Sequence, residues 1–240
     1  AVYNTRIMGV GHVQNVADLA CRTALSYHGV AHINFPVDLQ EQTGGERSKR
    51  NIAKHTSHVK GRRARLPADD DLARAAEVLN AGKRVAILCG QGALDATSEL
   101  ESVAERMGAP IVKALLGKAA VPDESPYTTG CIGLLGTKPS QETLESCDTL
   151  LMVGTSFPYI EFLPRPGQAR GVQIDLDPAR IGLRYSVEIG LVGDCGDMLR
   201  ALLPLLQRQE DRRFLEQTQK EMKKWWDLME ELGEREVKPM

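Results

Sequence analysis

Short apolar segments alternate with amphipathic segments from Asp69 to Leu206. The apolar segments are brief and mostly continuous, which is typical of strands that are buried on both faces of a sheet. They are residues 85–89, 111–114, 149–153, 172–174 and 189–192. The intervening segments place apolar residues at helical spacing, as Leu72, Ala75 and Leu79 do. This order predicts an α/β fold, a doubly wound parallel sheet that forms a Rossmann-like domain over residues 68–206.

Turn and capping residues set the expected boundaries of these elements. The three aspartates at 69–71 are predicted to cap the first helix, and Gly82 is predicted to end it. Residues 115–139 contain glycine and proline and are expected to form one long loop before a short helix over 141–146. Apart from that loop, most of residues 69–206 are expected to lie in helices or strands.

The two ends of the chain carry different patterns. Residues 13–27 predict an amphipathic helix, and residues 30–35 predict a strand that stops at Pro36. One helix and one strand cannot bury a core, so residues 1–40 are expected to be the remnant of another domain. The segment 207–240 contains a predicted helix from about Glu210 to Leu232, which is expected to pack on the domain or on a neighbour.

Residues 41–67 are expected to be a polar linker. The stretch from 38 to 67 carries eight Lys or Arg against three acids, but no aromatic residue stands among them to stack on bases, so nucleic acid is not expected as a partner. His55 and His58 lie within it, and no neighbouring Cys or acid completes a metal-ligand set. No metal site is therefore predicted.

Composition limits the setting. The 240 residues are 42% hydrophobic with a net charge of −2, as in an ordinary soluble globular chain. No apolar run reaches the roughly 18–20 residues that span a bilayer, and no secretion leader opens the chain. The five cysteines are scattered without a C-x-x-C pair, which favours a reducing, cytoplasmic location.

Glycine turns and acids follow the predicted strands, where an open parallel sheet binds nucleotides. The turn Gly90-Gln91-Gly92-Ala93-Leu94-Asp95 departs from the dinucleotide fingerprint, because Asp95 replaces the third small residue. The next strand ends in Lys113-Ala114 without the expected acid. A nicotinamide site is thus disfavoured, although the turn still suits a phosphate.

The acid role falls instead to residues after later strands. Asp175 is the better candidate for a ribose or adenine contact, whereas Asp177 and Asp194 serve equally well as helix caps. All five histidines lie at or before position 58, so no Ser-His-Asp set is available in the α/β region. Glu161 is a lone acid and is expected at the surface. No catalytic residue is predicted, and the domain is expected to bind rather than transform a ligand.

Four segments in order carry a resemblance to a known family. They are residues 108–118 (GAPIVKALLGK), 130–137 (GCIGLLGT), 154–159 (GTSFPY) and 174–182 (IDLDPARIG). Together they resemble the central domain of thiamine diphosphate-dependent enzymes, in the branch of pyruvate oxidase, quinone-linked pyruvate dehydrogenase and acetolactate synthase. Residues 30–40 are similar to the last strand of the family's pyrimidine-binding domain, and residues 237–240 to the approach to its diphosphate-binding domain.

The resemblance implies FAD in the central domain, or ADP as the alternative, with flavoprotein oxidoreductase chemistry carried by the cofactor. The contacts carried over by position are Gly90, Gly92, Ala93, Ala114, Leu115, Leu116, Ile132, Gly133, Leu134, Leu135, Gly154, Thr155, Ser156, Phe157, Pro158, Asp175, Leu176, Asp194 and Cys195.

The resemblance also limits the expected activity. The family's activating glutamate and its motif for magnesium and thiamine diphosphate have no counterpart in this sequence; residues 193–195 (GDC) lack the second glycine and the asparagines of that motif. The chain is therefore predicted to be a fragment of a 2-oxo-acid enzyme, inactive alone, that depends on the missing domains of a dimeric or tetrameric parent. The alternative is a stand-alone nucleotide-binding or oligomer-assembly module.

Overall fold

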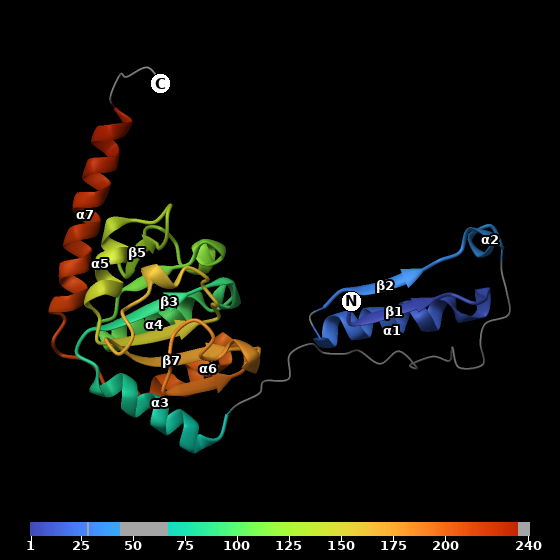
Figure 1. Cartoon of the computed structure of the whole chain (residues 1–240), viewed down its shortest axis with the longest axis horizontal. Coiled ribbons are helices and arrows are strands. Elements are labelled where there is room, and N and C mark those ends of the chain that lie inside the picture. Colours follow the sequence, from blue (N-terminus) through green and yellow to red (C-terminus); the bar gives the residue numbers. More distant parts are fainter. Residues whose placement is uncertain (28, 44–66, 235–240) are drawn as a thin grey trace. The chain divides into compact units, whose positions relative to one another are not determined.

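The structure is a computed structural model of the chain. It describes residues 1–27, 29–43 and 67–234. The chain divides into two compact units, Ala1–Arg63 and Ala64–Met240. Figure 1 shows the elements of each unit. Most of the predicted linker, including His55 and His58, lies outside the described residues.

The first unit is a small β-α-β arrangement. Strands β1 (Tyr3–Arg6) and β2 (Ala31–Asn34) pair in parallel, and helix α1 (Val13–Tyr27) connects them. A short helix, α2 (Val37–Gln40), follows. The prediction of α1 is confirmed, but β1 was not predicted, because its residues, Tyr-Asn-Thr-Arg, contain no apolar run. Ile7 and Ala20 are the buried apolar side chains of this unit among the residues described.

The second unit is built on six parallel strands in the order β5-β4-β3-β6-β7-β8. Their bounds are β3 (Val85–Cys89), β4 (Ile111–Lys113), β5 (Thr128–Cys131), β6 (Thr149–Val153), β7 (Arg170–Asp175) and β8 (Ile189–Val192). The chain starts at the centre with β3, moves outward through β4 to β5, and then crosses to β6. The direction of winding therefore reverses between β3 and β6, which is the topological switch point of a doubly wound sheet.

Helices cover both faces of this sheet. They are α3 (Asp69–Ala81), α4 (Thr97–Met107), α5 (Lys138–Ser146), α6 (Cys195–Leu202) and α7 (Arg213–Gly233). Residues Val85, Ile87 and Cys89 of β3 join the apolar core shared with α3, α4 and α6, whereas Ala86 and Leu88 join a second core that includes residues of α5. Burial on both faces is what the continuous apolar runs predicted, and the α/β fold class is confirmed.

Strand β5 was expected to be part of a loop. Its sequence, Thr-Thr-Gly-Cys, has no apolar run. Side chains of the following segment hold it instead: the Ser140 hydroxyl donates to the Thr129 carbonyl at 2.8 Å, and the Thr137 hydroxyl donates to the same oxygen at 2.5 Å. The former loop also contains a 3-10 helix, η3 (Leu115–Ala120). Hydrogen bonds from the following segment therefore stabilise a strand that the local sequence does not predict.

Of the two caps predicted for α3, the end at Gly82 is confirmed, whereas the start at the aspartates is wrong. Ala68 is the N-cap of α3, so the aspartates at 69–71 occupy its first turn, where they favour the positive end of the helix dipole. Gly82 follows α3 in an extended conformation, whereas Gly108 ends α4 at φ 57°, the left-handed conformation that glycine adopts most easily.

Candidate functional site

The predicted nucleotide contacts come together at one edge of the sheet. All six strands are parallel, so their carboxyl ends meet at the same edge, here called the carboxyl edge. Each strand is followed there by predicted contacts: residues 90–93, 114–116, 132–135, 154–158, 175–176 and 194–195. The predicted contacts therefore all lie in the segments that follow the strands at this one edge of the sheet.

The switch point between β3 and β6 is closed by direct contact of two glycine turns. The amide of Gly92 donates to the carbonyl of Gly154 at 2.9 Å. A Cβ on Gly154 would lie 2.6 Å from the Cα of Gly92, and a Cβ on Gly117 would lie 2.6 Å from the Cα of Gly90. Glycine is required at these positions for the three turns to touch, whatever ligand lies above them. The sequence reasoning did not identify Gly117.

The turn after β3 does not lead directly into a helix. A 3-10 turn, η2 (Gln91–Ala93), follows Gly90, and α4 begins only at Thr97. In a dinucleotide fold the glycine turn opens the helix whose N-terminus faces the pyrophosphate. The turn therefore departs from the dinucleotide arrangement in its geometry as well as in its sequence.

The predicted contacts differ in how far they reach solvent. Their exposed members are Gly92, Leu115, Leu116, Leu134, Leu135, Pro158 and Leu176. Half-buried members are Gly133, Gly154, Ser156 and Asp194. The buried members are Gly90, Ala93, Ala114, Ile132, Thr155, Phe157, Asp175 and Cys195. A ligand at the carboxyl edge meets the first group most directly, and the buried side chains support it from below.

The three candidate acids form turns and caps. The carboxylate of Asp175 accepts from the amide of Asp177 at 3.0 Å, and that of Asp177 accepts from the amide of Ala179 at 3.0 Å. Asp194 caps α6 by accepting from the amides of Gly196 and Asp197. The capping interpretation of Asp177 and Asp194 is confirmed. Among the described residues, the second carboxylate oxygen of Asp175 makes no hydrogen bond.

A buried lysine anchors the loop beside the exposed leucines. Lys113, the last residue of β4, is fully buried, and its ammonium group donates to Asp123 at 2.5 Å and to the carbonyl of Val121 at 3.2 Å. Lys118 pairs with the other oxygen of Asp123 at 2.5 Å. The hydrogen bond from Lys113, together with that from Lys118, holds the pKa of Asp123 below its usual value. The sequence analysis missed this cluster.

An aromatic cluster forms within the segment after β6. The rings of Phe157, Tyr159 and Phe162 meet edge to face, with centroids 5.6 to 6.5 Å apart. Gly133 of the neighbouring loop lies against Phe157, since a Cβ there would be 3.4 Å from its ring. Glu161 is exposed, as expected.

Nucleophiles and metal ligands are sparse in the described part of the chain. Burial raises the pKa of Cys89 and of Cys147 to about 12, so neither thiol is a nucleophile at neutral pH. Residues 1–27, 29–43 and 67–234 contain no group of three His, Cys, Asp or Glu positioned for a metal ion. Within the same ranges, no helix has the length and apolar character to span a membrane.

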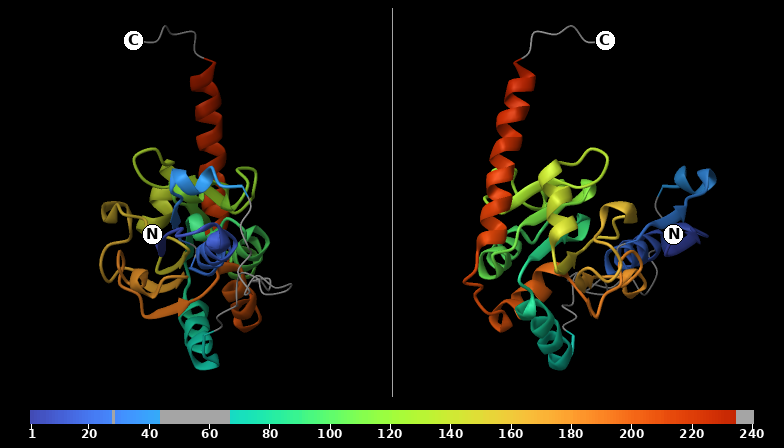
Figure 2. Two further views of the ribbon diagram at one scale, coloured as in Figure 1. Left: turned by 90° about the vertical axis from the view of Figure 1, so that its right-hand side faces the viewer. Right: turned by 60° about the vertical axis from the view of Figure 1, so that its left-hand side comes forward.

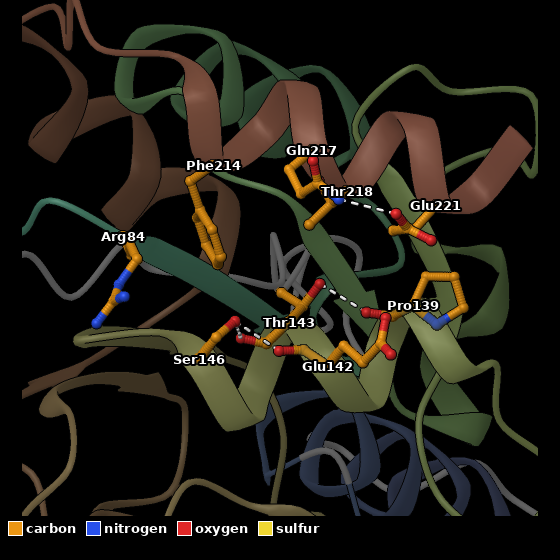
Figure 3. Close-up of a pocket in the computed structure, with 9 residues that line it drawn as sticks. All are labelled: Arg84, Pro139, Glu142, Thr143, Ser146, Phe214, Gln217, Thr218 and Glu221. Atoms are coloured by element: carbon orange, nitrogen blue, oxygen red, sulfur yellow. Dashed lines mark hydrogen bonds between the residues drawn. The ribbon is translucent and has the colours of Figure 1, made fainter.

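A separate groove of about 450 Å³ lies between α5 and α7, and none of the predicted contacts lines it (Figure 3). Its lining residues are Arg84, Pro139, Glu142, Thr143, Ser146, Phe214, Gln217, Thr218 and Glu221. Several polar groups there are already engaged within their own helices: Thr143 donates to the carbonyl of Pro139, and Gln217 donates to Glu221. We therefore consider the carboxyl edge, with its converging loops, the better candidate site.

Comparison with known proteins identifies a family that matches this chain. The family "Thiamine pyrophosphate enzyme, central domain" matches residues 72–202, which include every predicted contact. A putative thiamine pyrophosphate-containing protein of Bacillus subtilis, YdaP, is 40% identical over 230 residues, covering 96% of this chain and 39% of that protein. A pyruvate oxidase of Lactiplantibacillus plantarum is 28% identical over 244 residues, covering 100% of the chain and 40% of its own length.

A probable acetolactate synthase large subunit of Methanocaldococcus jannaschii is 29% identical over 227 residues, covering 88% of the chain and 37% of the subunit. The chain thus spans about two-fifths of the length of these three relatives. The family match extends from α3 to the end of α6 and covers more than half of the sequence. The chain therefore belongs to the family of thiamine pyrophosphate enzyme central domains.

Proposed function

We propose that this chain is the nucleotide-binding part of a thiamine diphosphate-dependent 2-oxo-acid enzyme of the pyruvate oxidase or acetolactate synthase type. The nucleotide is FAD, with ADP as the alternative, and it lies along the carboxyl edge of the sheet. The names of the relatives, pyruvate oxidase and acetolactate synthase, support the reaction type. The site itself is argued from the residues of this chain.

The observation that carries the proposal is an apolar surface at the carboxyl edge. Leu115 and Leu116 after β4 are 60% and 71% exposed, and Leu134 and Leu135 after β5 are 83% and 86% exposed. Because β4 and β5 are neighbours, these leucines belong to adjacent loops. Exposed apolar surface of this kind marks a ligand or partner site, and this edge is where open α/β sheets bind nucleotides.

Polar groups at the same edge suit the rest of a nucleotide. Gly92 is exposed, so a pyrophosphate can approach its backbone without meeting a side chain. Asp175 offers one carboxylate oxygen that the Asp177 amide does not use, which suits a ribose hydroxyl. The leucines provide flat apolar contact and exclude water. When bound, the flavin supplies redox chemistry, while these residues hold and orient it.

The thiamine chemistry is proposed to reside in other segments of a longer enzyme. In the described part of this chain, no acid or histidine cluster offers a metal-held diphosphate site. The two roles that such an enzyme needs, activating the thiamine and holding its diphosphate, are not assigned to any residue here. The chain alone is accordingly proposed to be inactive toward 2-oxo acids.

Titration calorimetry with ADP and with FAD tests the nucleotide site. ADP isolates the adenine end, so heat with ADP is expected even if the flavin ring requires further domains for firm binding. Asp175→Asn is expected to weaken ADP binding about tenfold, the value of one hydrogen bond to a charged group. Asp177→Asn is the matched control, because asparagine retains the cap and the residue is exposed. A folded sample that binds neither nucleotide would refute the proposal.

Catalytic inactivity needs a separate assay. The purified chain, supplied with thiamine diphosphate, magnesium and pyruvate, is expected to release no carbon dioxide above a blank without protein. Release above the blank would contradict the assignment of thiamine chemistry to other segments, while leaving the nucleotide titration to be judged by itself.

A further inference from the structure

Gln173 is a buried polar residue in the middle of strand β7. Its side chain is 1% exposed, and every residue of the strand from Gly171 to Asp175 is buried. Burying a side-chain amide costs free energy unless its donor and acceptor groups form hydrogen bonds. An apolar side chain at this position would avoid that cost. The partners of the Gln173 amide therefore matter more than the space that it fills.

The amide of Gln173 joins two loops at the carboxyl edge. Its nitrogen donates to the carbonyl of Arg180 at 3.1 Å and to the carbonyl of Thr155 at 3.4 Å, and its oxygen accepts from the amide of Gly182 at 2.8 Å. Thr155 follows β6, whereas Arg180 and Gly182 follow β7. The two loops lie side by side in Figure 2, where they are coloured yellow to orange. One buried side chain thus connects the segments that follow two neighbouring strands.

The turn at residues 180–182 is also fitted to the sheet by packing. Gly190 of β8 is the register partner of Gln173. A Cβ on Gly190 would overlap the side chain of Ile181, so Ile181 packs directly on the backbone of β8. Gly182 has φ 71°, a conformation that favours glycine, and it turns the chain after Ile181. The turn is therefore held by Ile181 on β8 and by the Gln173 amide on β7.

We propose that Gln173 is a positioning residue of the nucleotide site, an inference that rests on the proposed function. Asp175 lies two residues further along, on the same face of β7, and its carboxylate accepts from the amide of Asp177 at 3.0 Å. Asp177 belongs to the segment that Gln173 closes, so Gln173 fixes the direction of the Asp175 carboxylate. On the other side, the hydroxyl of Thr155 accepts from the amide of Phe157 at 3.2 Å, so the turn after β6 is fixed through Thr155.

Gln168 makes the same kinds of hydrogen bond at the opposite, amino edge of the sheet. Its nitrogen donates to the carbonyls of Leu144 and Cys147, both at 3.0 Å, and its oxygen accepts from the amide of Arg165 at 3.2 Å. These partners precede β6 and β7, and none is a predicted nucleotide contact. The same substitution at Gln168 therefore removes an equivalent set of hydrogen bonds away from the proposed site.

Titration calorimetry with ADP compares Gln173→Met with Gln168→Met. Methionine is unbranched like glutamine but forms none of these hydrogen bonds. Both variants are expected to unfold at a lower urea concentration than the wild type, because each leaves backbone groups unpaired. Gln173→Met is expected to weaken ADP binding about tenfold, and Gln168→Met to stay within about twofold of the wild type. Unchanged affinity in Gln173→Met, or equal weakening in both variants, overturns the inference.

A double-mutant cycle tests whether Gln173 acts through Asp175. Asp175→Asn is expected to weaken ADP binding about tenfold in the wild type, but no more than about threefold in the Gln173→Met background. A tenfold loss in both backgrounds would show that the two residues act independently, and would overturn the positioning role. A wild-type chain that binds neither ADP nor FAD refutes the proposed function and this inference together, whereas the preceding outcomes refute the inference alone.

Hydrogen exchange of the wild-type chain gives a readout that needs no variant to fold. Residues 180–182 contain no predicted nucleotide contact, and the Gln173 amide joins them to the site. Saturating ADP is therefore expected to slow exchange of the Gly182 amide at least about threefold. The Arg165 amide, which Gln168 holds, is the control and is expected to exchange at the same rate with and without ADP. Unchanged exchange at Gly182 while calorimetry records ADP binding overturns the inference.

Discussion

The two edges of the six-stranded sheet are built differently. At the amino edge, backbone and charged groups are paired: Asp148 accepts from the amides of Lys83 and Arg84, and Arg170 forms a two-pronged ion pair with Glu188 at 2.8 Å. The segment 205–212 is also tied down there and at α4, for example through Asn80 and Arg106. At the carboxyl edge, glycine turns touch one another and leucines face solvent.

The two edges therefore differ in the kind of contact that closes them. The amino edge uses side chains to close the fold and leaves few groups for a ligand. At the switch point, the carboxyl edge is closed by backbone contact between turns, and its exposed leucine side chains remain available for binding. Changes at the two edges should therefore have different consequences, and the following experiments test that contrast in order of expected effect.

The largest effect is expected from Gly154→Ala at the switch point. The added Cβ would lie 2.6 Å from the Cα of Gly92, and the residue has φ 58°, so both clash and backbone strain apply. A loss of about 3 kcal/mol in unfolding free energy is expected from denaturant titration. Gly167→Ala is the control, because φ is 79° there but a Cβ meets nothing within 4 Å; it should lose only about 1 kcal/mol. Equal losses would show that turn packing is unimportant.

The next largest effect is expected at the buried lysine. Asp123→Asn leaves the Lys113 ammonium buried without its counter-ion, and should cost about 2 kcal/mol, less than for a fully buried pair because Asp123 is partly exposed. Lys113→Met removes the buried charge itself and should cost less than Asp123→Asn. The reverse order in urea titrations would contradict the role assigned to this pair.

The same pair predicts a pH dependence. The pKa of Asp123 is lowered in the folded chain, chiefly by hydrogen bonds from Lys113 and Lys118. Its stabilising contribution is therefore complete above the unfolded pKa near 4 and is lost as pH falls through the lower folded value. The stability gap between wild type and Asp123→Asn should shrink as pH is lowered below about 4. A gap that widens in acid would contradict this sign.

A smaller effect is expected at the amino edge. Arg170 and Glu188 are both about half exposed, so their ion pair is screened by solvent despite its good geometry. Arg170→Met should change the unfolding free energy by less than about 1 kcal/mol and leave nucleotide binding unaltered. Weakened ADP binding in this variant would indicate that the amino edge contributes to recognition after all.

The smallest effect is kinetic and compares two thiols. Cys131 ends β5 at the carboxyl edge and is half-buried, whereas Cys147 precedes β6 at the amino edge and is buried. Burial raises the pKa of both thiols, that of Cys147 to about 12. In a Cys21→Ser background, alkylation should label Cys131 about tenfold faster than Cys147, and ADP or FAD should slow only Cys131. Mass spectrometry of labelled peptides provides the rates; equal labelling would remove the contrast.

The sequence predicted the centre of the sheet better than its margins. Residues 85–89 and 149–153, the two central strands, form strands with the expected bounds, because a strand buried on both faces must be continuously apolar. The edge strand at residues 189–192 also has the expected bounds, although only Ile189 and Leu191 in it are buried. Strands β1 and β5 were not predicted, since each is polar and is defined by pairing partners elsewhere in the chain. Their existence depends on tertiary contacts that no local pattern records.

In the candidate site, too, some features could be predicted from the local sequence and others depend on tertiary contacts. Positions after each strand were predictable, because parallel strands must deliver them to one edge. The partners of Lys113 were not, because a lysine in a strand normally indicates an exposed position and its burial depends on Asp123 in a later loop. Likewise, nothing near Gly117 in the sequence reveals that its turn touches Gly90.

Hydrogen exchange with and without nucleotide tests the central claim most directly. With saturating ADP or FAD, slowed exchange is expected in the carboxyl-edge segments 90–95, 114–118, 132–136 and 154–158. The groove between α5 and α7, represented by residues 139–146 and 214–221, should be unchanged. Protection confined to that groove, or no protection anywhere while calorimetry records binding, would contradict a nucleotide site at the carboxyl edge.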